Sequence, residues 1–525
     1  MSDHPSIFND VIGPVMRGPS SSHCAASLRI GRLCRDLMGG DITSILIEFD
    51  PNGSLATTHI DQGSDMGLFG GFLGWEADDE RLPDSEKHLA DAGISVAIEI
   101  TDIGASHPNT YKLTLSNPLE THRLTAISTG GGMIEVIEID GAAVSLAGGQ
   151  YVTLVYCDQP AEVIAAAGSR PEFYDVTVRT GGRTFVEIRS GAFPDDDFLS
   201  ELTAMGGVGV IRKLAPVLPV LTGRGVSVPF ITCDEMLAYN EGKGLELWEL
   251  AVHYEAARGG ISNGEVFEKM RSIVRIMDAA VKTGLSGTEY ADRILGSQSV
   301  RFKEQLDGDR LIAGDVNNTV IMYVSAVMEV KSSMGVIVAA PTAGSCGALP
   351  GAVLGTAHTL GLPEDDIVRA MLAAGIIGVF ITAHATFAAE VGGCMAETGA
   401  GAGMAAAALV GLAGGSLDRS LAAASLALQN SLGLICDPIG NRVEAPCLGR
   451  NVLAATNAIS CANMALAGYD HLIPLDEVIG AMKEVGDRIH HTLRCTNLGG
   501  LSITRTAKKI EAELGQTPKT LFKIC

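Results

Sequence analysis

The chain has 525 residues, with 38 basic and 61 acidic side chains, and a formal net charge of −23. This excess of negative charge argues against nucleic acids and anionic membrane surfaces as partners, because their approach works against electrostatic repulsion. Hydrophobic residues make up 46% of the chain and charged residues 19%, which excludes a wholly disordered protein. The length of the chain suggests about three domains.

Residues 1–147 mix strand-like and turn-rich segments. Segments 44–50 (SILIEFD) and 95–103 (SVAIEITDI) alternate apolar and polar residues, which is typical of half-buried strands. Segment 23–38 (HCAASLRIGRLCRDLM) predicts a helix entered through Ser20, Ser21 and Ser22. The N-terminus has neither a basic patch nor an apolar run. We therefore expect an α+β domain in a cytoplasmic protein whose cysteines are thiols or metal ligands.

Residues 148–215 predict a compact β-α-β-β module. Segment 151–157 is a strand, and segment 158–168 is a helix with Pro160 near its first turn. Two alternating strands then flank the Gly181-Gly182 turn. DQPAEVI at 158–164 resembles the D-x-P-G-x-I stretch of ACT domains, small modules that often pair and bind amino acids, although Ala161 replaces the usual glycine. A plain structural module without a ligand is an equal alternative.

Residues 216–525 predict a large all-helical domain. Between Arg369 and Asp418 only Glu390 and Glu397 are charged, so this Ala/Gly-rich stretch must be nearly surrounded by protein. Segment 370–389 is long enough to cross a bilayer. Because it is rich in alanine and carries polar residues, we expect a buried core helix instead. The predicted fold class is therefore an α+β multidomain protein.

Three cysteines of this region, Cys394, Cys436 and Cys447, stand near Gly or Pro, where a chain turns. A lone buried cysteine is usually a small hydrophobic residue. Three in polar turns, with Glu397, Asp437 and Glu444 close by, favour thiolates that share one cavity. Forty-one and ten residues separate them, without a C-x2-C pair, which disfavours a structural zinc site. Three thiolates without a near fourth suit an iron-sulfur cluster with one iron open to substrate.

With these features the chain resembles the iron-sulfur-dependent L-serine dehydratases (L-serine ammonia-lyases), in the arrangement that fuses the beta and alpha parts in one polypeptide. The C-x41-C-x10-C spacing matches the cluster signature of that family. The segments that resemble the alpha part are 332–351, 392–410, 434–451 and 457–468. Those that resemble the beta part are GPSSSH at 18–23, HPNT at 107–110 and STGGG at 128–132.

The resemblance implies a cofactor and a reaction. Cys394, Cys436 and Cys447 would hold a 4Fe-4S cluster, and its remaining iron would act as a Lewis acid on the hydroxyl group of L-serine. The products would be pyruvate and ammonia, without pyridoxal phosphate. Cys525, the last residue, would be a further metal ligand, because in some relatives a terminal cysteine folds back onto the open iron. Cys495 is a weaker candidate for that place.

The resemblance also assigns supporting residues. The implied catalytic residues are Ser22, His23 and His107, and the implied substrate-binding residues are Ser20, Ser21, Asn109, Thr342 and Ser345. From the residues alone, a helix N-cap is the better explanation of the serines, and each histidine is interpreted as a surface or capping residue. Cys346 matches the family without being a cluster ligand there.

Several residues depart from the family pattern. Cys24 replaces a threonine, Gln62 replaces a histidine although His59 is near, and Lys331 replaces the asparagine of NASMGR. These changes leave three other hypotheses open. The substrate could be cysteine, threonine or a more acidic β-substituted amino acid, or the chain could be a non-catalytic, cluster-bearing sensor, or remotely a membrane carrier. We expect a small-molecule amino-acid substrate, no nucleic-acid or membrane partner, and a homodimer or higher homo-oligomer.

Overall fold

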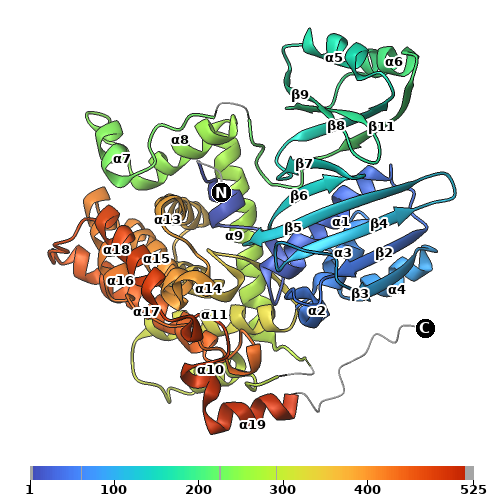
Figure 1. Cartoon of the computed structure of the whole chain (residues 1–525). Coiled ribbons are helices and arrows are strands. Elements are labelled where there is room, and N and C mark those ends of the chain that lie inside the picture. Colours follow the sequence, from blue (N-terminus) through green and yellow to red (C-terminus); the bar gives the residue numbers. More distant parts are fainter. Residues whose placement is uncertain (1–3, 61, 224–225, 291–292, 515–525) are drawn as a thin grey trace. The chain divides into compact units, whose positions relative to one another are not determined.

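The computed structural model describes residues 4–60, 62–223, 226–290 and 293–514 (Figure 1). The chain divides into two compact units. Unit 1 joins the N-terminal segment up to Pro19 with the chain from Ser227 onward, and unit 2 is Ser20–Val226. Helices and sheets are both present, so the mixed α/β class is confirmed. The predicted domain boundaries at 147/148 and 215/216 remain predictions.

A six-stranded sheet forms the centre of unit 2, in the strand order β3-β2-β4-β5-β6-β7. β2 and β3 are parallel, and the other neighbouring strands are antiparallel. The two alternating segments of the sequence form β2 and β3. The six strands are β2 Ser44–Phe49, β3 Ser95–Ile100, β4 Thr110–Ser116, β5 Thr121–Gly130, β6 Met133–Ile139 and β7 Ala142–Leu146.

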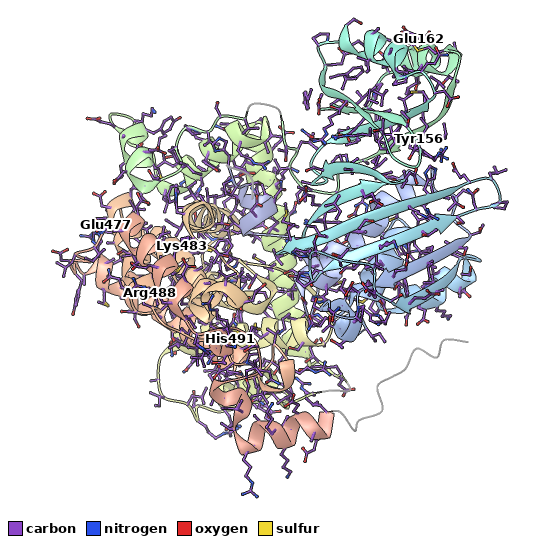
Figure 2. All side chains as sticks on the ribbon, in the orientation of Figure 1. Tyr156, Glu162, Glu477, Lys483, Arg488 and His491 are labelled. Atoms are coloured by element: carbon purple, nitrogen blue, oxygen red, sulfur yellow. The ribbon has the colours of Figure 1, made fainter. Side chains whose placement is uncertain are left out.

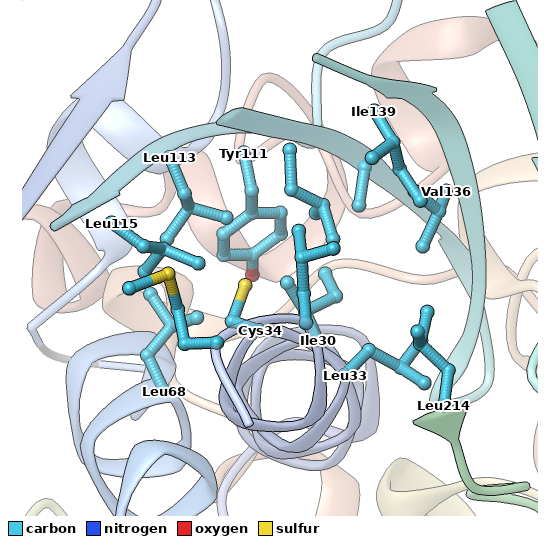
Figure 3. Packing of buried hydrophobic residues seen from close by; sticks show 14 of the residues in the cluster. Ile30, Leu33, Cys34, Leu68, Tyr111, Leu113, Leu115, Val136, Ile139 and Leu214 are labelled. Atoms are coloured by element: carbon cyan, nitrogen blue, oxygen red, sulfur yellow. The ribbon is translucent and has the colours of Figure 1, made fainter. Parts of the chain in front are cut away.

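Helix α1 (Ala26–Leu37) and helix α3 (Ser64–Phe72) cover one face of this sheet (Figure 3). The two helices meet at Gly31 and Gly71, where a Cβ on Gly31 would lie 2.5 Å from the Leu68 carbonyl oxygen. Ile30 and Cys34 of α1 point toward the strand that carries Tyr111, and Leu33 lies beside Leu214. Short elements complete the layer: the π-helix η2 Ser21–Ala25, α2 Leu55–Thr58, the 3₁₀ helix η3 Leu82–Asp84 and α4 Ser85–Asp91.

The rest of unit 2 is a four-stranded antiparallel sheet in the order β11-β8-β10-β9 with two helices. The predicted β-α-β-β succession is confirmed, and α6 and β11, which the sequence analysis missed, extend it to β-α-β-β-α-β. The Tyr156 hydroxyl of β8, labelled in Figure 2, donates to Asp140 Oδ2 at 2.7 Å. The elements are β8 Tyr151–Cys157, α5 Pro160–Gly168, β9 Phe173–Arg179, β10 Phe185–Ser190, α6 Asp196–Ala204 and β11 Val208–Leu214.

Unit 1 is mostly helical in its described residues. Its first helices are η1 Ile7–Val11, α7 Cys233–Asn240, α8 Leu247–Gly259, α9 Asn263–Ser286, α10 Gln298–Asp307, α11 Asp315–Ser332, η4 Ala343–Ser345, α12 Ala348–Leu360 and α13 Glu364–His384. They are followed by α14 Ala389–Gly392, η5 Met395–Gly399, α15 Ala400–Leu412, α16 Leu417–Gln429, η6 Ile439–Asn441, α17 Cys447–Leu466, α18 Leu475–Arg488, η7 His491–Leu493, η8 Gly500–Ile503 and α19 Arg505–Leu514.

One strand pair interrupts the helices of unit 1. β1 (Val15–Arg17) pairs antiparallel with β12 (Val336–Val338), so that Val15 lies opposite Val338. The prediction of an all-helical C-terminal part is therefore wrong at Val336–Val338. The physical reason is that the N-terminal segment supplies the strand partner, which the local Ala/Gly-rich pattern does not reveal.

Helix α13 lies inside unit 1 and accepts the N-terminal segment. A Cβ on Gly375 would lie 2.7 Å from Ile7, and one on Gly378 would lie 2.1 Å from Val11. These glycines let η1 pack directly on the helix. Two segments of the described chain, Glu364–His384 and Met395–Leu412, are long and apolar enough to cross a membrane, but 78% and 83% of their most apolar windows are buried within the protein. That burial is the pattern of core helices in a soluble protein, as the sequence predicted for segment 370–389.

The outer helix α18 is amphipathic. Val478, Ile479 and Met482 are buried, whereas Glu477, Lys483 and Arg488 carry its charge at the surface (Figure 2). Lys483 Nζ pairs with Asp487 at 2.7 Å. Exposed pairs of this kind contribute little to stability, so the apolar face anchors the helix.

Candidate functional site

The three predicted cluster cysteines lie in unit 1, at the ends of elements. Cys394 is the N-cap of η5, Cys436 lies between α16 and α17, and Cys447 is the first residue of α17. Their exposed fractions are 2%, 4% and 7%. The Met395 amide donates to the Leu434 carbonyl at 3.0 Å, which joins the Cys394 and Cys436 segments. Cys394 and Cys436, distant in sequence, are thus side by side.

The Cys394 thiol is the most acidic of these three thiols. It is hydrogen-bonded to Cys436, and Arg450 Nη1 donates to Cys394 Sγ at 3.3 Å. The hydrogen bond from Cys436, aided by Arg450 and opposed by burial, lowers the pKa of Cys394 to about 7. The same contact, with a second one to Cys495, raises the pKa of Cys436. Cys394 is therefore the member of the pair that ionises more readily.

Cys447 is held by a residue that the sequence analysis missed. Asn451 is fully buried, and its Nδ2 donates to the carbonyls of Cys447 and Gly344, both at 2.9 Å. Its Oδ1 accepts the amides of Gly347 and Ala348. Asn451 thus ties the start of α17 to the 341–347 turn. Burial raises the pKa of Cys447 to about 12.

A fourth thiol, that of Cys495, adjoins the predicted three. The Cys436 amide donates to the Leu493 carbonyl, and the Cys495 amide donates to the Cys436 carbonyl, both at 2.9 Å. Cys495 has a left-handed backbone, with φ at 61°, and its thiol interacts with that of Cys436. Cys525, the predicted additional ligand, lies outside the described residues. No local signal marks Cys495, because the contact joins segments far apart in the chain.

The predicted substrate contacts Thr342 and Ser345 belong to the turn before α12. Thr342 caps η4 by accepting the Ser345 amide at 3.1 Å, and its hydroxyl donates to Glu397 Oε1 at 2.9 Å. Burial, followed by the neighbouring Cys394, raises the pKa of Glu397 well above its usual range. The sequence analysis noted Glu397 only as a neighbour of Cys394.

Ser345 differs from Thr342 because its hydroxyl makes no hydrogen bond to a described residue, although the side chain is fully buried. A buried hydroxyl without a partner is costly, and native proteins keep few of them. Its position beside the Thr342–Glu397 pair supports the prediction that it contacts a bound polar group.

The other two acidic neighbours of the cysteines have structural contacts. Asp437 pairs with Arg450 and accepts the Leu501 amide at 2.7 Å. Glu444 accepts the Tyr290 hydroxyl at 2.7 Å and also two backbone amides. Lys331, the departure from the family pattern, is fully buried in α11 and donates to the Val443 carbonyl. Its ammonium therefore points to the segment between Cys436 and Cys447.

The residues predicted from the beta part lie in unit 2, where a hydrogen-bond chain joins several of them. His23 Nδ1 contacts the Ser20 hydroxyl at 3.0 Å, and Nε2 contacts Thr58 Oγ1 at 3.1 Å. Thr58 donates its one proton to the Ser54 carbonyl at 2.6 Å. His23 Nε2 therefore carries a hydrogen, and Nδ1 accepts from Ser20. Burial lowers the pKa of His23 to about 4, so the ring is neutral at neutral pH.

The same chain reaches the HPNT segment. The Ser54 hydroxyl donates to Asn109 Oδ1, and the backbone amide of Asn109 donates to His107 Nδ1 at 3.1 Å. Ser54 and Thr58 are common polar residues outside any motif, and the sequence analysis did not single them out. The structure thus links Ser20, His23, His107 and Asn109 in one network.

Ser21 and Ser22 occupy the first turn of η2, next to this network. Ser20 is the N-cap residue, but its hydroxyl goes to His23 and does not cap the helix. A simple N-cap therefore does not account for this hydroxyl. Near Gln62, the departure in the IDQGSD stretch, His59 Nδ1 pairs with Asp65 Oδ2 at 2.8 Å. His59 thus has a hydrogen-bonded carboxylate partner of its own.

The Cys, His, Asp and Glu side chains of the site can be compared with the ligands that a metal ion or a metal cluster requires. Within residues 4–514, apart from the short gaps, no group of three or more His, Cys, Asp or Glu side chains is arranged to hold a metal ion. An iron-sulfur cluster makes a different demand, because its several irons each bind a separate cysteine thiolate. Cys436 contacts Cys394 and Cys495, and Cys447 interacts electrostatically with Cys394 and Cys495. Thiols are soft sulfur ligands, so the residues fit such a cluster in ligand type.

The chain is similar in sequence to known serine dehydratases. The family model described as serine dehydratase alpha chain matches residues 242–502. The probable L-serine dehydratase alpha chain of Bacillus subtilis (strain 168) is 34% identical over 285 residues, which is 54% of this chain and 95% of that protein. The L-serine dehydratase alpha chain of Peptoniphilus asaccharolyticus is 35% identical over 283 residues, 54% of this chain and 97% of that protein. The L-serine dehydratase of Streptomyces coelicolor (strain ATCC BAA-471 / A3(2) / M145) is 29% identical over 438 residues, 79% of this chain and 91% of that protein.

Proposed function

Because the chain belongs to the L-serine dehydratase family, with the alpha part fused into one polypeptide, we propose that it eliminates water from L-serine. The chain is an enzyme of the lyase class. Loss of the α-proton and of the hydroxyl group gives 2-aminoacrylate, which tautomerises to an imine. Water hydrolyses the imine to pyruvate and ammonia, so atoms balance without another reactant.

We also propose a 4Fe-4S cluster as the cofactor, with Cys394, Cys436 and Cys447 as its ligands. The observation that carries this proposal is the contact between the buried thiols of Cys394 and Cys436, which 41 residues of sequence separate. Cys447 interacts electrostatically with Cys394. When bound, a cluster with one iron free of protein ligands supplies a Lewis acid for the departing hydroxyl group. Cys525 stays a predicted further ligand, and the contact of Cys495 with Cys436 supports it as the alternative.

The side chains of unit 1 have defined tasks in this proposal. Ser345 offers a buried hydroxyl without a protein partner, which suits a hydrogen bond to the polar groups of serine. Thr342 offers its oxygen while its proton is held by Glu397. Glu397 accepts the Thr342 hydroxyl and so keeps the turn in place.

The network of unit 2 supplies a candidate base. A neutral imidazole accepts a proton, and His23 is neutral above about pH 4, the pKa to which burial lowers it. The accepting atom is Nδ1, which accepts a hydrogen bond from the Ser20 hydroxyl in this structure. Ser21, Ser22, His107 and Asn109 remain predicted substrate or catalytic residues beside it.

The decisive experiment combines cluster analysis with turnover. Protein is purified without oxygen, and iron, sulfide and ammonia release from L-serine are measured for the wild type, Cys436→Ala and the control Cys461→Ala. Cys461 is fully buried in α17 and contacts Asn430. We expect Cys436→Ala to lose iron and at least about 100-fold of the activity, because even the outer partners of metal ligands are worth 10–100-fold. The control should keep both.

Other results identify the alternatives. Iron-free, colourless wild type with full activity would refute the cluster. Faster release of ammonia from cysteine, threonine or an acidic β-substituted amino acid than from serine would change the substrate. Cluster-loaded protein that binds serine without turnover would identify a sensor.

We propose further that the protein works in the cytoplasm as a homodimer or higher homo-oligomer, without nucleic acid or membrane. The net charge of −23 and the burial of both long apolar helices support the absence of those two partners. Light scattering of the anaerobic protein gives the number of subunits, and a monomer at working concentration would contradict the assembly.

A further inference from the structure

Lys331 lies in the last turn of α11, and its side chain is fully buried. Its ammonium donates to the carbonyl of Val443. Val443 belongs to the segment that separates Cys436 from Cys447. The Lys331 side chain thus extends from α11 and places its ammonium at the segment between two predicted ligands.

This charge lacks an acidic partner in the described part of the chain. No described carboxylate lies within ion-pair distance of Lys331, whereas the other cation of the site, Arg450, pairs with Asp437. The nearby Glu444 is engaged by Tyr290 and two backbone amides. An ammonium bonded only to a neutral carbonyl is expensive to bury. We therefore expect the buried ammonium of Lys331 to make a favourable interaction with another group in the site.

Two thiols and two carboxyl groups face Lys331. The interactions that favour its charged form come first from Cys346 and Cys447, and then from Glu444 and Glu397. The ammonium and a thiolate are each costly here alone, but together each relieves the cost of the other.

We propose that Lys331 is a positioning residue that supplies the buried positive charge facing Cys447, and thereby retains an anionic iron-sulfur cluster in the site. The inference rests on the proposed cofactor and goes beyond it by giving a role to a residue outside the ligand set. A charge used in this way is not offered to the substrate. Lys331 therefore gives no support to an acidic substrate.

The test compares two substitutions with a control. Lys331→Met removes the charge and the hydrogen bond, whereas Lys331→Gln removes the charge and keeps a donor. The control is Lys483→Met, on the exposed face of α18 (Figure 2). Each protein is loaded anaerobically with iron and sulfide. We then measure the rate of iron loss to a chelator, the midpoint potential of the cluster and the thermal stability of the metal-free protein.

The proposal has a distinctive pattern of results. Both Lys331 variants should lose iron about 10–100-fold faster than the wild type. Their midpoint potential should be lower, because removal of a positive charge disfavours an added electron. The metal-free variants should be at least as stable as the metal-free wild type, because a costly buried charge is gone. The control should match the wild type in all three.

Three outcomes would overturn the inference. Wild-type rates of iron loss and an unchanged potential in both variants would remove the role of Lys331 while leaving the proposed function intact. A wild-type rate in Lys331→Gln alone would show that the hydrogen bond matters and the charge does not. A wild type that takes up no cluster would refute the proposed cofactor together with this inference.

Discussion

At the residue scale, His23 is held between the hydroxyls of Ser20 and Thr58, and burial lowers its pKa from 6.5 to about 4. Between these values the unfolded chain binds more protons, so the free energy of unfolding falls as the pH drops from about 6.5 to 4. A shift of this size corresponds to at most about 3 kcal/mol. In His23→Gln this contribution should vanish. Urea unfolding of both proteins at several pH values measures the difference, and parallel curves would contradict the assignment.

Ser345 permits a second prediction at this scale. Its hydroxyl has no described partner, so Ser345→Ala should leave the stability of the substrate-free protein unchanged or raise it. The same change should lower kcat/KM for serine by about 10-fold or more, as expected for a lost hydrogen bond to a charged group. The control Ser425→Ala removes a buried hydroxyl that donates to the Ile473 carbonyl at 2.6 Å. It should show the reverse, a loss of stability with an unchanged KM.

The residues that could be predicted from the sequence are those with unusual chemistry or family spacing, such as Cys394, Cys436 and Cys447. Asn451, Ser54 and Thr58 could not be predicted, because asparagine, serine and threonine are common at helix ends and turns. Their meaning comes from partners far along the chain, such as Gly344 for Asn451. Cys495 needed the backbone pairing with Cys436 before its position was informative.

At the scale of elements, helix α8 anchors the N-terminal segment through a buried carboxyl group. Glu255 accepts the Ser6 hydroxyl at 2.5 Å and the Ile7 amide at 2.7 Å, and the Tyr254 hydroxyl donates to the Pro5 carbonyl at 2.8 Å. Burial raises the pKa of Glu255 from 4.5 to about 7 despite these hydrogen bonds. The carboxyl group therefore takes up a proton on folding between those two pH values.

This protonation predicts a pH dependence of the opposite sign to that of His23. The folded protein binds the additional proton, so the free energy of unfolding should fall as the pH rises from about 4.5 to 7, by at most about 3 kcal/mol. Glu255→Gln keeps a neutral side chain and should lose this dependence. Thermal unfolding of wild type and variant at pH 5 and 7.5 makes the comparison. An equal change with pH in both proteins would refute it.

Elements with strong local patterns were predictable, including β2, β3, α1 and the first four elements of the module. β11 was missed, because Gly209 and the charged pair Arg212 and Lys213 weaken its alternation. β12 is only three residues long, and its pairing with β1 spans the greater part of the chain. No short-range periodicity contains such information.

At the scale of the whole molecule, unit 1 is assembled from two separate stretches of sequence. A chain that lacks residues 1–19 should therefore keep the fold of unit 2 and lose stability in unit 1. Hydrogen exchange can be followed in full-length and shortened proteins. Amides of β2 and β4 should keep their protection, whereas those of α13 and β12 should exchange faster. Equal protection of α13 in both proteins would mean that the N-terminal segment contributes little.

The pairing of β1 with β12 also has a consequence for biosynthesis. The ribosome releases the residues of β1 roughly 320 positions before those of β12, which at about 5–20 residues per second is a delay of about 16–64 seconds. During that time the apolar side chains of Ile7 and Val11 lack their neighbours Gly375 and Gly378 of α13. The nascent polypeptide therefore exposes a short apolar N-terminal segment while its middle part folds. We expect chaperones that bind emerging chains to recognise this segment.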